Sequence, residues 1–371
     1  LQRLRELGLQ AEYRPIPDSI FDDPEYTHGD NEQSYEGRPN VVGTLGGKKG
    51  RSVILSSHSD VVPAATWDEA FAPSYDGEYV VGRGASDAKG QIVTMWLALA
   101  ALREAGFEPR GRIEAQIVIE EEPGGNGALA LIRQGCRADG VVVMEASSLN
   151  VFPANRGAIW FRARTTGRAV HMGRRHEGVN AIEKMMEAIA RMLEYEQRLI
   201  EASRGHPLFT RYENPVQLCL GTIRADGWPS MVAGECVLEG GVGFLPNKAM
   251  AEIKQELLDA VMQTEDKWLR EHFELTFPKL HNDAYEIDPR HPLPVTLNQA
   301  VRDCGHASEI FGWNVSCDAR LYAKIAGLPT VVYGPSDIVQ AHSVGECIRV
   351  DDMLAAASGL AQFLVRWCGG E

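Results

Sequence analysis

The chain has 371 residues, of which 44% are hydrophobic and 24% charged, as is typical of a folded globular protein. Its formal net charge of −14 argues against nucleic-acid binding, which needs a basic face, and disfavours anionic membranes. The length exceeds that of one ordinary hydrophobic core, so we expect two domains, or one domain with a large insertion.

The seven cysteines are spread along the chain without a Cys-x-x-Cys pair, and their number is odd. This pattern favours reduced thiols and a cytoplasmic location over a disulfide framework. No apolar run is long enough to span a bilayer, and the start does not resemble a signal peptide. Because the chain begins inside an expected helix, we expect its natural start to lie upstream.

The first part of the chain predicts strands at residues 40–45 and 52–57, and the second of these leads directly into His58. A long apolar helix is expected from about Gln91 to Ala105, and Asp87 lies just before it. A carboxylate at that place often caps a helix. Helix capping is therefore the simplest interpretation of Asp87 taken alone.

Three successive carboxylates, Glu120, Glu121 and Glu122, end the strand predicted at residues 112–120. These side chains repel one another, so the cluster costs stability unless a cation or a proton neutralises it. A metal site with one spare carboxylate and a solvated acidic turn are both consistent with this stretch.

A helix at residues 129–134 and a strand at 140–145 follow, so strands and helices alternate along this part of the chain. This alternation predicts an α/β fold with a doubly wound, mostly parallel sheet. Binding sites in such sheets lie where the parallel strands end. We therefore expect His58, Glu122 and Glu145 at one edge of the sheet.

The pattern changes at residue 157. Three strands of antiparallel type and two long helices are predicted there, at residues 159–165, 216–223, 235–244, 181–203 and 247–271. We expect an inserted α+β domain over residues 157–287, which separates a first domain into two parts at 1–156 and 288–371. The last part predicts a helix, a strand and a closing helix, at residues 294–304, 330–333 and 351–367.

Five residues at strand ends or in loops combine imidazole and carboxylate groups: His58, Asp87, Glu122, Glu145 and His342. This mixture suits zinc, cobalt or manganese better than magnesium. Five ligands suit two ions that share one carboxylate, and two ions about 3.5–4 Å apart activate water and hold the substrate's oxygen. A single histidine is more often a core or surface group, so the argument rests on the common position of the five.

Two further acidic residues lie beside these expected ligands. Asp60, two residues after His58, is placed to accept the second ring N–H of that histidine. Glu121 points to the face opposite Glu122 if the strand pleat continues, which predicts an unligated general base.

These residues stand in segments that resemble the M20 metallopeptidase family, which includes enzymes of the acetylornithine deacetylase type. The segments are His58-Ser-Asp-Val-Val-Pro63, Gly82 to Gly90, Glu120-Glu-Glu-Pro-Gly-Gly125 and Ala341-His-Ser-Val-Gly-Glu346. The resemblance runs nearly from end to end, in order and with matching spacing. It implies a catalytic domain with two zinc ions and an inserted lid domain through which two chains dimerise.

The resemblance also implies a division of the ligands between the two ions. Asp87 matches the carboxylate that bridges them, His58 and Glu145 match the ligands of one ion, and Glu122 and His342 match those of the other. The peptide bond after Asp87 is expected in the cis form.

Further roles follow from the resemblance. Glu121 matches the general base, Asp60 matches the residue that orients the ligand histidine, and His171 matches a lid histidine that reaches the substrate in the partner subunit. The substrate-binding residues implied are Ser316, Arg320 and Gly334. Two departures remove groups that often hold a substrate carboxylate, namely Ser230-Met-Val-Ala233 and Gly241-Val-Gly243 in the lid.

We therefore predict a dinuclear zinc amidohydrolase, with cobalt or manganese as alternative ions. A metal hydroxide would remove the acyl group of an N-acyl amine or N-acyl amino acid. The alternatives left open are a formylaminopyrimidine deformylase, another aminohydrolase acting on a C–N bond, and a protein that keeps its metals for structure or binding. The expected partners are a small amide and a second copy of the chain, without nucleic acid or membrane.

Overall fold

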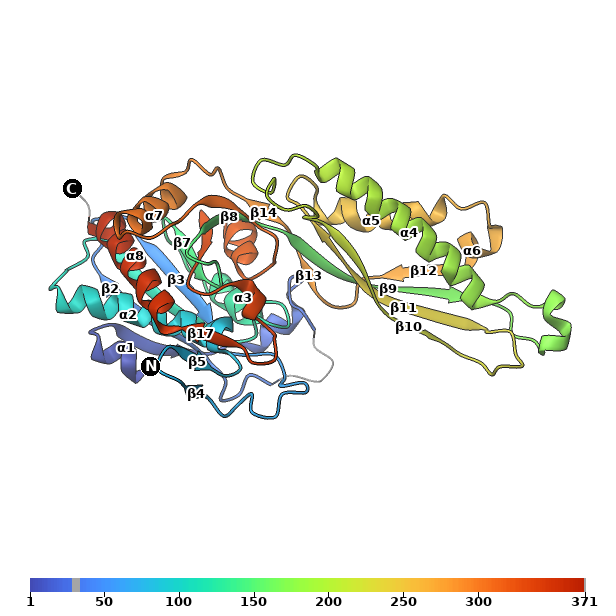
Figure 1. Cartoon of the computed structure of the whole chain (residues 1–371), viewed down its shortest axis with the longest axis horizontal. Helices are drawn as coiled ribbons and strands as arrows, with labels where there is room; N and C mark the ends of the chain where they lie inside the picture. Colours follow the sequence, from blue (N-terminus) through green and yellow to red (C-terminus); the bar gives the residue numbers. More distant parts are fainter. Residues whose placement is uncertain (29–33, 370–371) are drawn as a thin grey trace. The chain divides into compact units, whose positions relative to one another are not determined.

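The computed structural model describes residues 1–28 and 34–369, and both of its compact units mix helices and strands (Figure 1). Unit 1 comprises Leu1–Ala154, Glu286–Trp313 and Cys317–Glu371, and unit 2 comprises Asn155–Tyr285 and Asn314–Ser316. Among the described residues, no helix combines the length and the apolar character that crossing a membrane requires.

A nine-stranded mixed sheet forms the centre of unit 1. Its order is β1 (Gln10–Arg14), β2 (Asn40–Gly46), β6 (Arg112–Val118), β3 (Val53–His58), β7 (Val141–Met144), β16 (Thr330–Tyr333), β8 (Val151–Asn155) and β14 (Tyr285–Glu286), with β15 (Ile310–Trp313) paired to β8. The four central strands β6, β3, β7 and β16 run parallel, whereas β1 and β2 are antiparallel. The parallel centre confirms the predicted α/β class.

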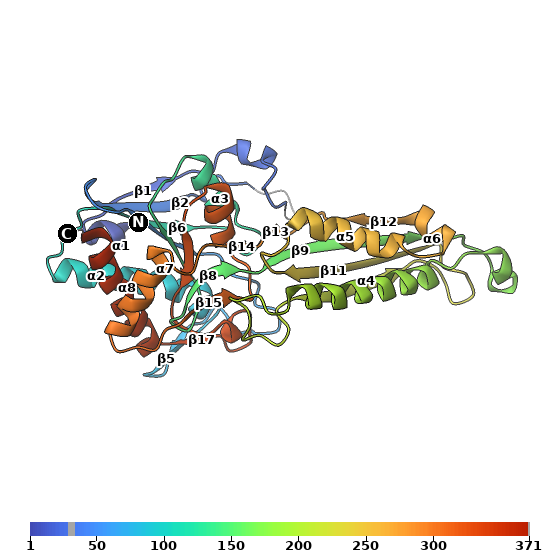
Figure 2. The same ribbon diagram turned by 90° about the horizontal axis from the view of Figure 1, so that it is seen from above.

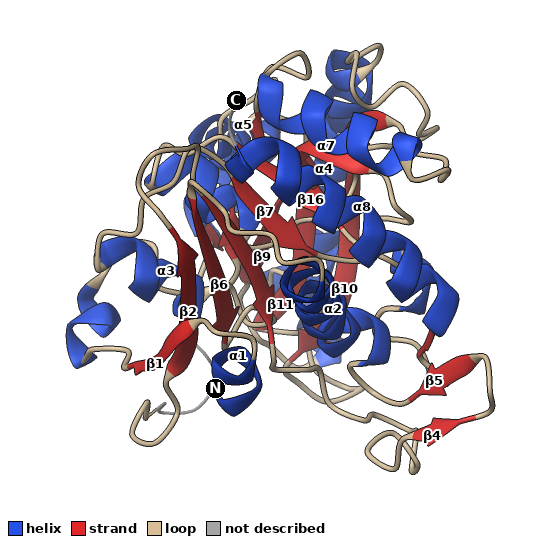
Figure 3. Ribbon diagram, turned by 90° about the vertical axis from the view of Figure 1, so that its left-hand side faces the viewer, coloured by secondary structure: helices blue, strands red, loops and turns tan. Residues whose placement is uncertain are grey.

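Helices cover both faces of this sheet, as Figure 3 shows. The helices of unit 1 are α1 (Gln2–Glu6), α2 (Gly90–Glu104), α3 (Asn126–Arg133), α7 (Pro292–Asp303) and α8 (Val350–Gly369). From β3 the chain crosses to β6 through α2, and it then returns past β3 to β7 through α3. Right-handed crossovers in opposite directions place α2 and α3 on opposite faces.

The core of unit 1 lies mainly where α2, α7 and α8 meet the sheet. Leu55 of β3, Leu99 of α2, Val301 of α7 and Phe363 of α8 are at most 1% exposed and belong to one apolar cluster. Their burial anchors the strands whose carboxyl ends carry the predicted ligands. Unit 1 also holds a small sheet of β17 (Cys347–Arg349), β5 (Tyr79–Val81) and β4 (Ser74–Tyr75), and the short helices η1 (Asp18–Asp22), η2 (Ala85–Lys89), η4 (Leu321–Ile325) and η5 (Ile338–Gln340).

Unit 2 is an antiparallel sheet with helices along it (Figure 2). Its strands follow the order β10 (Gln217–Ala225), β11 (Glu235–Phe244), β9 (Gly157–Thr166) and β12 (Phe273–Thr276), with β13 (His281–Asn282) also paired to β9. Its helices are η3 (Met172–Glu177), α4 (Ala181–Ser203), α5 (Met250–Met262) and α6 (Lys267–His272). Ile159, Phe161 and Ala163 of β9 are buried and Trp160 between them is exposed, which is the period of two expected for a sheet with one covered face.

Two element predictions need correction. The helix predicted at residues 247–271 is two helices, because Asp266 begins α6 as its N-cap and accepts a hydrogen bond from the Leu269 N–H over 2.9 Å. The strand predicted at residues 112–120 ends at Val118. The carboxylates that follow therefore stand in a turn and not on a continued strand pleat.

Candidate metal centre and active site

The parallel strands bring His58 and Glu145 together. His58 is the last residue of β3, and Glu145 follows the last residue of β7. Strand pairing aligns Ser56 with Val143, so these two strand ends lie side by side. Nε2 of His58 is 3.5 Å from Oε1 of Glu145, and the two residues are 1% and 4% exposed.

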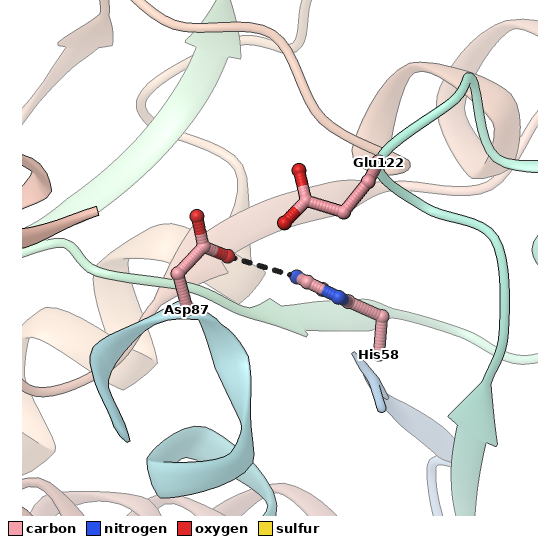
Figure 4. Close-up of side chains that lie close together, drawn as sticks. All are labelled: His58, Asp87 and Glu122. Atoms are coloured by element: carbon pink, nitrogen blue, oxygen red, sulfur yellow. Dashed lines mark hydrogen bonds and ion pairs between the residues drawn. The ribbon is translucent and has the colours of Figure 1, made fainter. Parts of the chain in front are cut away.

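Asp87 lies between two histidines. Its Oδ1 is 3.0 Å from Nε2 of His58, and its Oδ2 is 3.3 Å from Nε2 of His342. The same nitrogen of His342 is 3.1 Å from Oε2 of Glu122. Figure 4 shows the side chains of His58, Asp87 and Glu122 turned toward one another. The arrangement has two halves that share Asp87, one with His58 and one with His342.

The donor atoms in this cluster fit a metal ion. One ligand atom each of His58, Asp87 and Glu122 lies within 4.8 Å of the others. In the part of the chain that the structure describes, the buried Oε1 of Glu122 has no hydrogen-bond partner. A buried carboxylate oxygen in that state costs free energy unless a cation or a proton reaches it. Imidazole nitrogens with carboxylate oxygens suit zinc, cobalt or manganese. The peptide bond after Asp87 is cis, as expected.

The electrostatics of the cluster also favour a cation. Burial raises the pKa of Glu145 well above its ordinary value, and the negative charges of Asp87 and Glu122 add to this shift. Hydrogen bonds to Asp87 and Glu122 raise the pKa of His342 to about 10. Burial lowers the pKa of His58, but the charge of Glu145 and its other acidic neighbours outweigh this and hold it well above the ordinary value. The site therefore concentrates negative charge that a metal ion would neutralise.

Asp60 fixes the orientation of His58. The Nδ1 atom of His58 lies 3.1 Å from the backbone oxygen of Asp60 and 3.4 Å from its Oδ1. Both are oxygen atoms that can accept a proton, so Nδ1 carries a proton in this arrangement. Oδ2 of Asp60 accepts a hydrogen bond from the backbone N–H of Glu122 over 3.2 Å. Asp60 thus contacts both halves of the cluster.

The carboxylate of Glu121 lies beside the cluster without a hydrogen-bond partner of its own among the described residues. Burial raises its pKa well above the ordinary value, and the charges of Asp318, Glu145 and Glu122 act in the same direction. A carboxylate with a raised pKa accepts a proton more readily at neutral pH.

Glu120 anchors the turn that carries Glu121 and Glu122. Its side chain is 3% exposed and accepts hydrogen bonds from Tyr35 Oη over 2.5 Å, Arg38 Nη2 over 3.0 Å and Asn126 Nδ2 over 3.2 Å. Its backbone adopts the left-handed conformation, with φ of 60°. The sequence did not reveal this role, because the partners at residues 35 and 38 lie more than eighty residues away along the chain.

Two of the residues predicted to bind substrate, Arg320 and Gly334, contact the backbone of the loops that carry the cluster. Arg320 is 3% exposed, donates to the Gly124 carbonyl over 3.1 Å and lies 3.6 Å from the Glu25 carboxylate. A Cβ on Gly334 would stand 2.5 Å from the carbonyl oxygen of Glu145, so only glycine fits there. Their contact with substrate stays a prediction.

The other two predicted residues, His171 and Ser316, belong to unit 2. His171 is exposed, and its Nδ1 accepts the N–H of Gly173 over 3.2 Å. In the neutral ring Nε2 then carries the proton and is a donor. Oγ of Ser316 is buried and has no hydrogen-bond partner among residues 1–28 and 34–369. The contacts that the resemblance implies for these two residues stay predictions.

Known proteins match the chain over most of its length. The N-formyl-4-amino-5-aminomethyl-2-methylpyrimidine deformylase of Bacillus subtilis (strain 168) is 30% identical over 362 residues, which span 90% of this chain and 84% of that protein. The acetylornithine deacetylase of Photorhabdus laumondii is 24% identical over 372 residues, which span 98% of this chain and 88% of that protein.

The fold has a close counterpart among solved structures. The crystal structure of a tripeptidase from Staphylococcus aureus superposes with a TM-score of 0.75 at 19% identity, covering 99% of this chain and 91% of that one. A family model described as peptidase family M20/M25/M40 matches residues 54–366. The chain therefore belongs to peptidase family M20/M25/M40 and is a metal-dependent hydrolase of amide bonds.

Proposed function

We propose that the chain is a dinuclear zinc enzyme that removes a small acyl group from the nitrogen of an amine. Among small acyl groups, formyl is the one we favour. The observation that carries the proposal is the position of Asp87, whose two oxygens face two different histidines. The formyl group is favoured because the relative at 30% identity is named as a deformylase of an aminomethylpyrimidine.

The five predicted ligands would hold two cations in this arrangement. His58 and Glu145 would bind the first ion, Glu122 and His342 the second, and Asp87 both. Zinc is the ion we infer, and cobalt and manganese suit the same donors. Ions held there would acidify water and draw charge from the amide oxygen.

Glu121 would move the proton that the reaction requires. Its free carboxylate takes a proton from the attacking water, and water oxygen then bonds to the acyl carbon. The protonated Glu121 gives this proton to the amide nitrogen as the C–N bond breaks, which releases the amine and formic acid. The formic acid keeps the second proton of the water and loses it to solvent as it becomes formate. Asp60 would keep the His58 ring in the tautomer that leaves Nε2 free of a proton.

A second substrate class is N-acetyl amino acids. The named acetylornithine deacetylase relative aligns over 98% of this chain, which favours this class. The two classes differ in the carboxylate beside the acylated nitrogen. A substrate panel with matched N-formyl and N-acetyl forms of an aminomethylpyrimidine and of an amino acid would separate them.

The base role is tested with Glu121→Gln, which keeps the shape of the side chain and removes the proton acceptor. We expect turnover to fall about 10²- to 10⁴-fold while the zinc content is unchanged. Glu177→Gln on unit 2 is a control, since Glu177 pairs with the exposed Arg174. Wild-type turnover in Glu121→Gln would rule out the base role.

We further propose that unit 2 dimerises with a second copy of the chain. Strand β10 ends the sheet order, and its Leu220 and Ile223 are 37% and 53% exposed. On α4, Ile182, Met186 and Leu193 are 40%, 63% and 40% exposed. No described strand pairs with the outer edge of β10, and such an edge beside apolar helix residues suits a symmetric partner.

The partner role of His171 has a direct test in mixed dimers. His171→Ala and Glu121→Gln chains should each be inactive, and heterodimers of the two should regain activity at one intact site. Confirmed heterodimers without activity would contradict a site shared between chains. A monomer in light scattering would contradict the dimer itself.

A further inference from the structure

A buried ion pair closes the loop that carries Asp87. Nη1 of Arg83 donates to Oε2 of Glu346 over 2.7 Å, and the two residues are 7% and 0% exposed. The guanidinium carbon of Arg83 also lies 5.6 Å from the ring centroid of Trp67. Burying two charges carries a desolvation penalty that an apolar pair of similar size avoids. The pair therefore calls for a reason other than stability.

The second oxygen of Glu346 supplies that reason, because it holds the backbone next to Asp87. Oε1 of Glu346 accepts the backbone N–H groups of Ser86 and Asp87, each over 2.9 Å. Hydrogen bonds to a charged oxygen are stronger than bonds between neutral groups. With Arg83 on its other oxygen, the carboxylate of Glu346 cannot turn away without losing a charged partner.

Strand pairing in turn fixes Glu346. The next residue, Cys347, begins β17 and lies opposite Val81 of β5. The carbonyl of Glu346 accepts the N–H of Gly82 over 2.9 Å. Four residues earlier, Nε2 of His342 is 3.3 Å from Oδ2 of Asp87. The short segment 342–346 thus contacts both the side chain and the backbone N–H of Asp87.

We propose that Glu346, held by Arg83, is a positioning residue that sets Asp87 between His58 and His342. The inference rests on the proposed metal centre and adds to it a residue that touches neither ion nor substrate. The pair Glu346 and Arg83 would then fix the distance between the two halves of the site, because Asp87 is the group they share.

The experiment compares Glu346→Gln, Arg83→Met and the double variant in the full chain. Zinc affinity is measured on the metal-free chain by competition with a chromophoric chelator, beside the thermal midpoint. Glu78→Gln is the matched control, because Glu78, which directly precedes β5, pairs with Arg349 of β17 at 2.9 Å but is exposed. Amide hydrogen exchange of residues 82–90 is followed in the same variants.

We expect Glu346→Gln to bind zinc about 10- to 100-fold more weakly, because loss of a residue that orients a metal ligand usually weakens metal binding by this factor. Exchange at Ser86 and Asp87 should be faster. The double variant leaves no buried charge unpaired, so its thermal midpoint should rise above that of Glu346→Gln. Its zinc affinity should stay low, which a role in stability alone does not predict. The control should match the wild type.

Wild-type zinc affinity in Glu346→Gln would overturn the inference. So would a double variant that regains zinc affinity together with its thermal midpoint. Zinc affinity, the thermal midpoint and amide hydrogen exchange are all measured without a substrate, so the proposed activity is judged separately. A chain that binds two zinc ions but hydrolyses no N-formyl or N-acetyl amine would contradict the proposed reaction and leave the role of Glu346 intact.

Discussion

Replacing Tyr35 by phenylalanine tests whether Tyr35 holds the turn that carries Glu121. Tyr35 Oη donates to Oε2 of the buried Glu120 over 2.5 Å and lies 3.0 Å from Tyr26 Oη. Burial raises the pKa of Tyr35, and the Glu120 carboxylate raises it further, so the hydroxyl keeps its proton and remains the donor. The substitution removes one oxygen and leaves the ring in place.

The size of the effect follows from the contacts that remain. A hydrogen bond to a charged group contributes about 1.5–3 kcal/mol and a neutral one about 1 kcal/mol. Oε2 of Glu120 keeps Asn126 as a donor at 3.2 Å, which places the charged bond at the lower end of its range. With the bond to Tyr26 included, unfolding should become easier by about 2–3 kcal/mol. Turnover should also fall about 10-fold, because small displacements of Glu121 slow the reaction.

The measurements are urea unfolding by tryptophan fluorescence and steady-state turnover. The transition of each unit is fitted separately, because a chain of two units need not unfold in one step. Tyr13→Phe is the control, since Tyr13 is 58% exposed on β1. If Tyr35→Phe matched the wild type in both unfolding and turnover, the account of Glu120 as an anchor would be refuted.

Two further outcomes follow from single sites. Gly334→Ala should lower the free energy of unfolding by about 1–3 kcal/mol and reduce turnover, because the new Cβ displaces the Glu145 carbonyl. Thermal unfolding measures the first effect, and kcat measures the second. The hydrogen bond from Arg133 holds the pKa of Asp23 below its ordinary value, so this pair stabilises the fold at neutral pH and loses that contribution as the pH falls below about 4. Urea unfolding across that range should depend less on pH in Arg133→Met, and an unchanged slope would contradict it.

The central strands, and the meeting of His58 and Glu145 at their ends, were predictable from the sequence. Residues 53–58 and 141–144 are buried at every position and begin with apolar side chains, and strands of this kind end at one edge of a parallel sheet. His58 and Glu145 stand at those ends, so their proximity follows from local pattern and a general rule. The parallel centre of the sheet confirmed the α/β class, and the family model that matches residues 54–366 confirmed the M20 resemblance.

The residues that hold the predicted ligands in position, Glu120 and Glu346, were not predictable in this way. From the sequence, Glu120 was one of three neighbouring acidic residues with no role of its own. In the structure, hydrogen bonds from Tyr35 and Arg38 to its carboxylate fix the turn that follows. Glu346 lies about 260 positions from the N–H groups that it accepts. Such contacts depend on how distant loops pack, and no periodic pattern records them. The helix break before Asp266 was missed because the surrounding residues continue a helical pattern.

Metal stoichiometry tests the central claim most directly. The full chain is reconstituted with zinc, freed of excess metal and analysed for zinc per chain, beside Asp87→Ala and the control His306→Ala. We predict two zinc ions per chain in the wild type and in His306→Ala, and a loss of at least one in Asp87→Ala, since both halves of the site share Asp87. One ion or none in the wild type, or two in Asp87→Ala, would contradict the dinuclear centre.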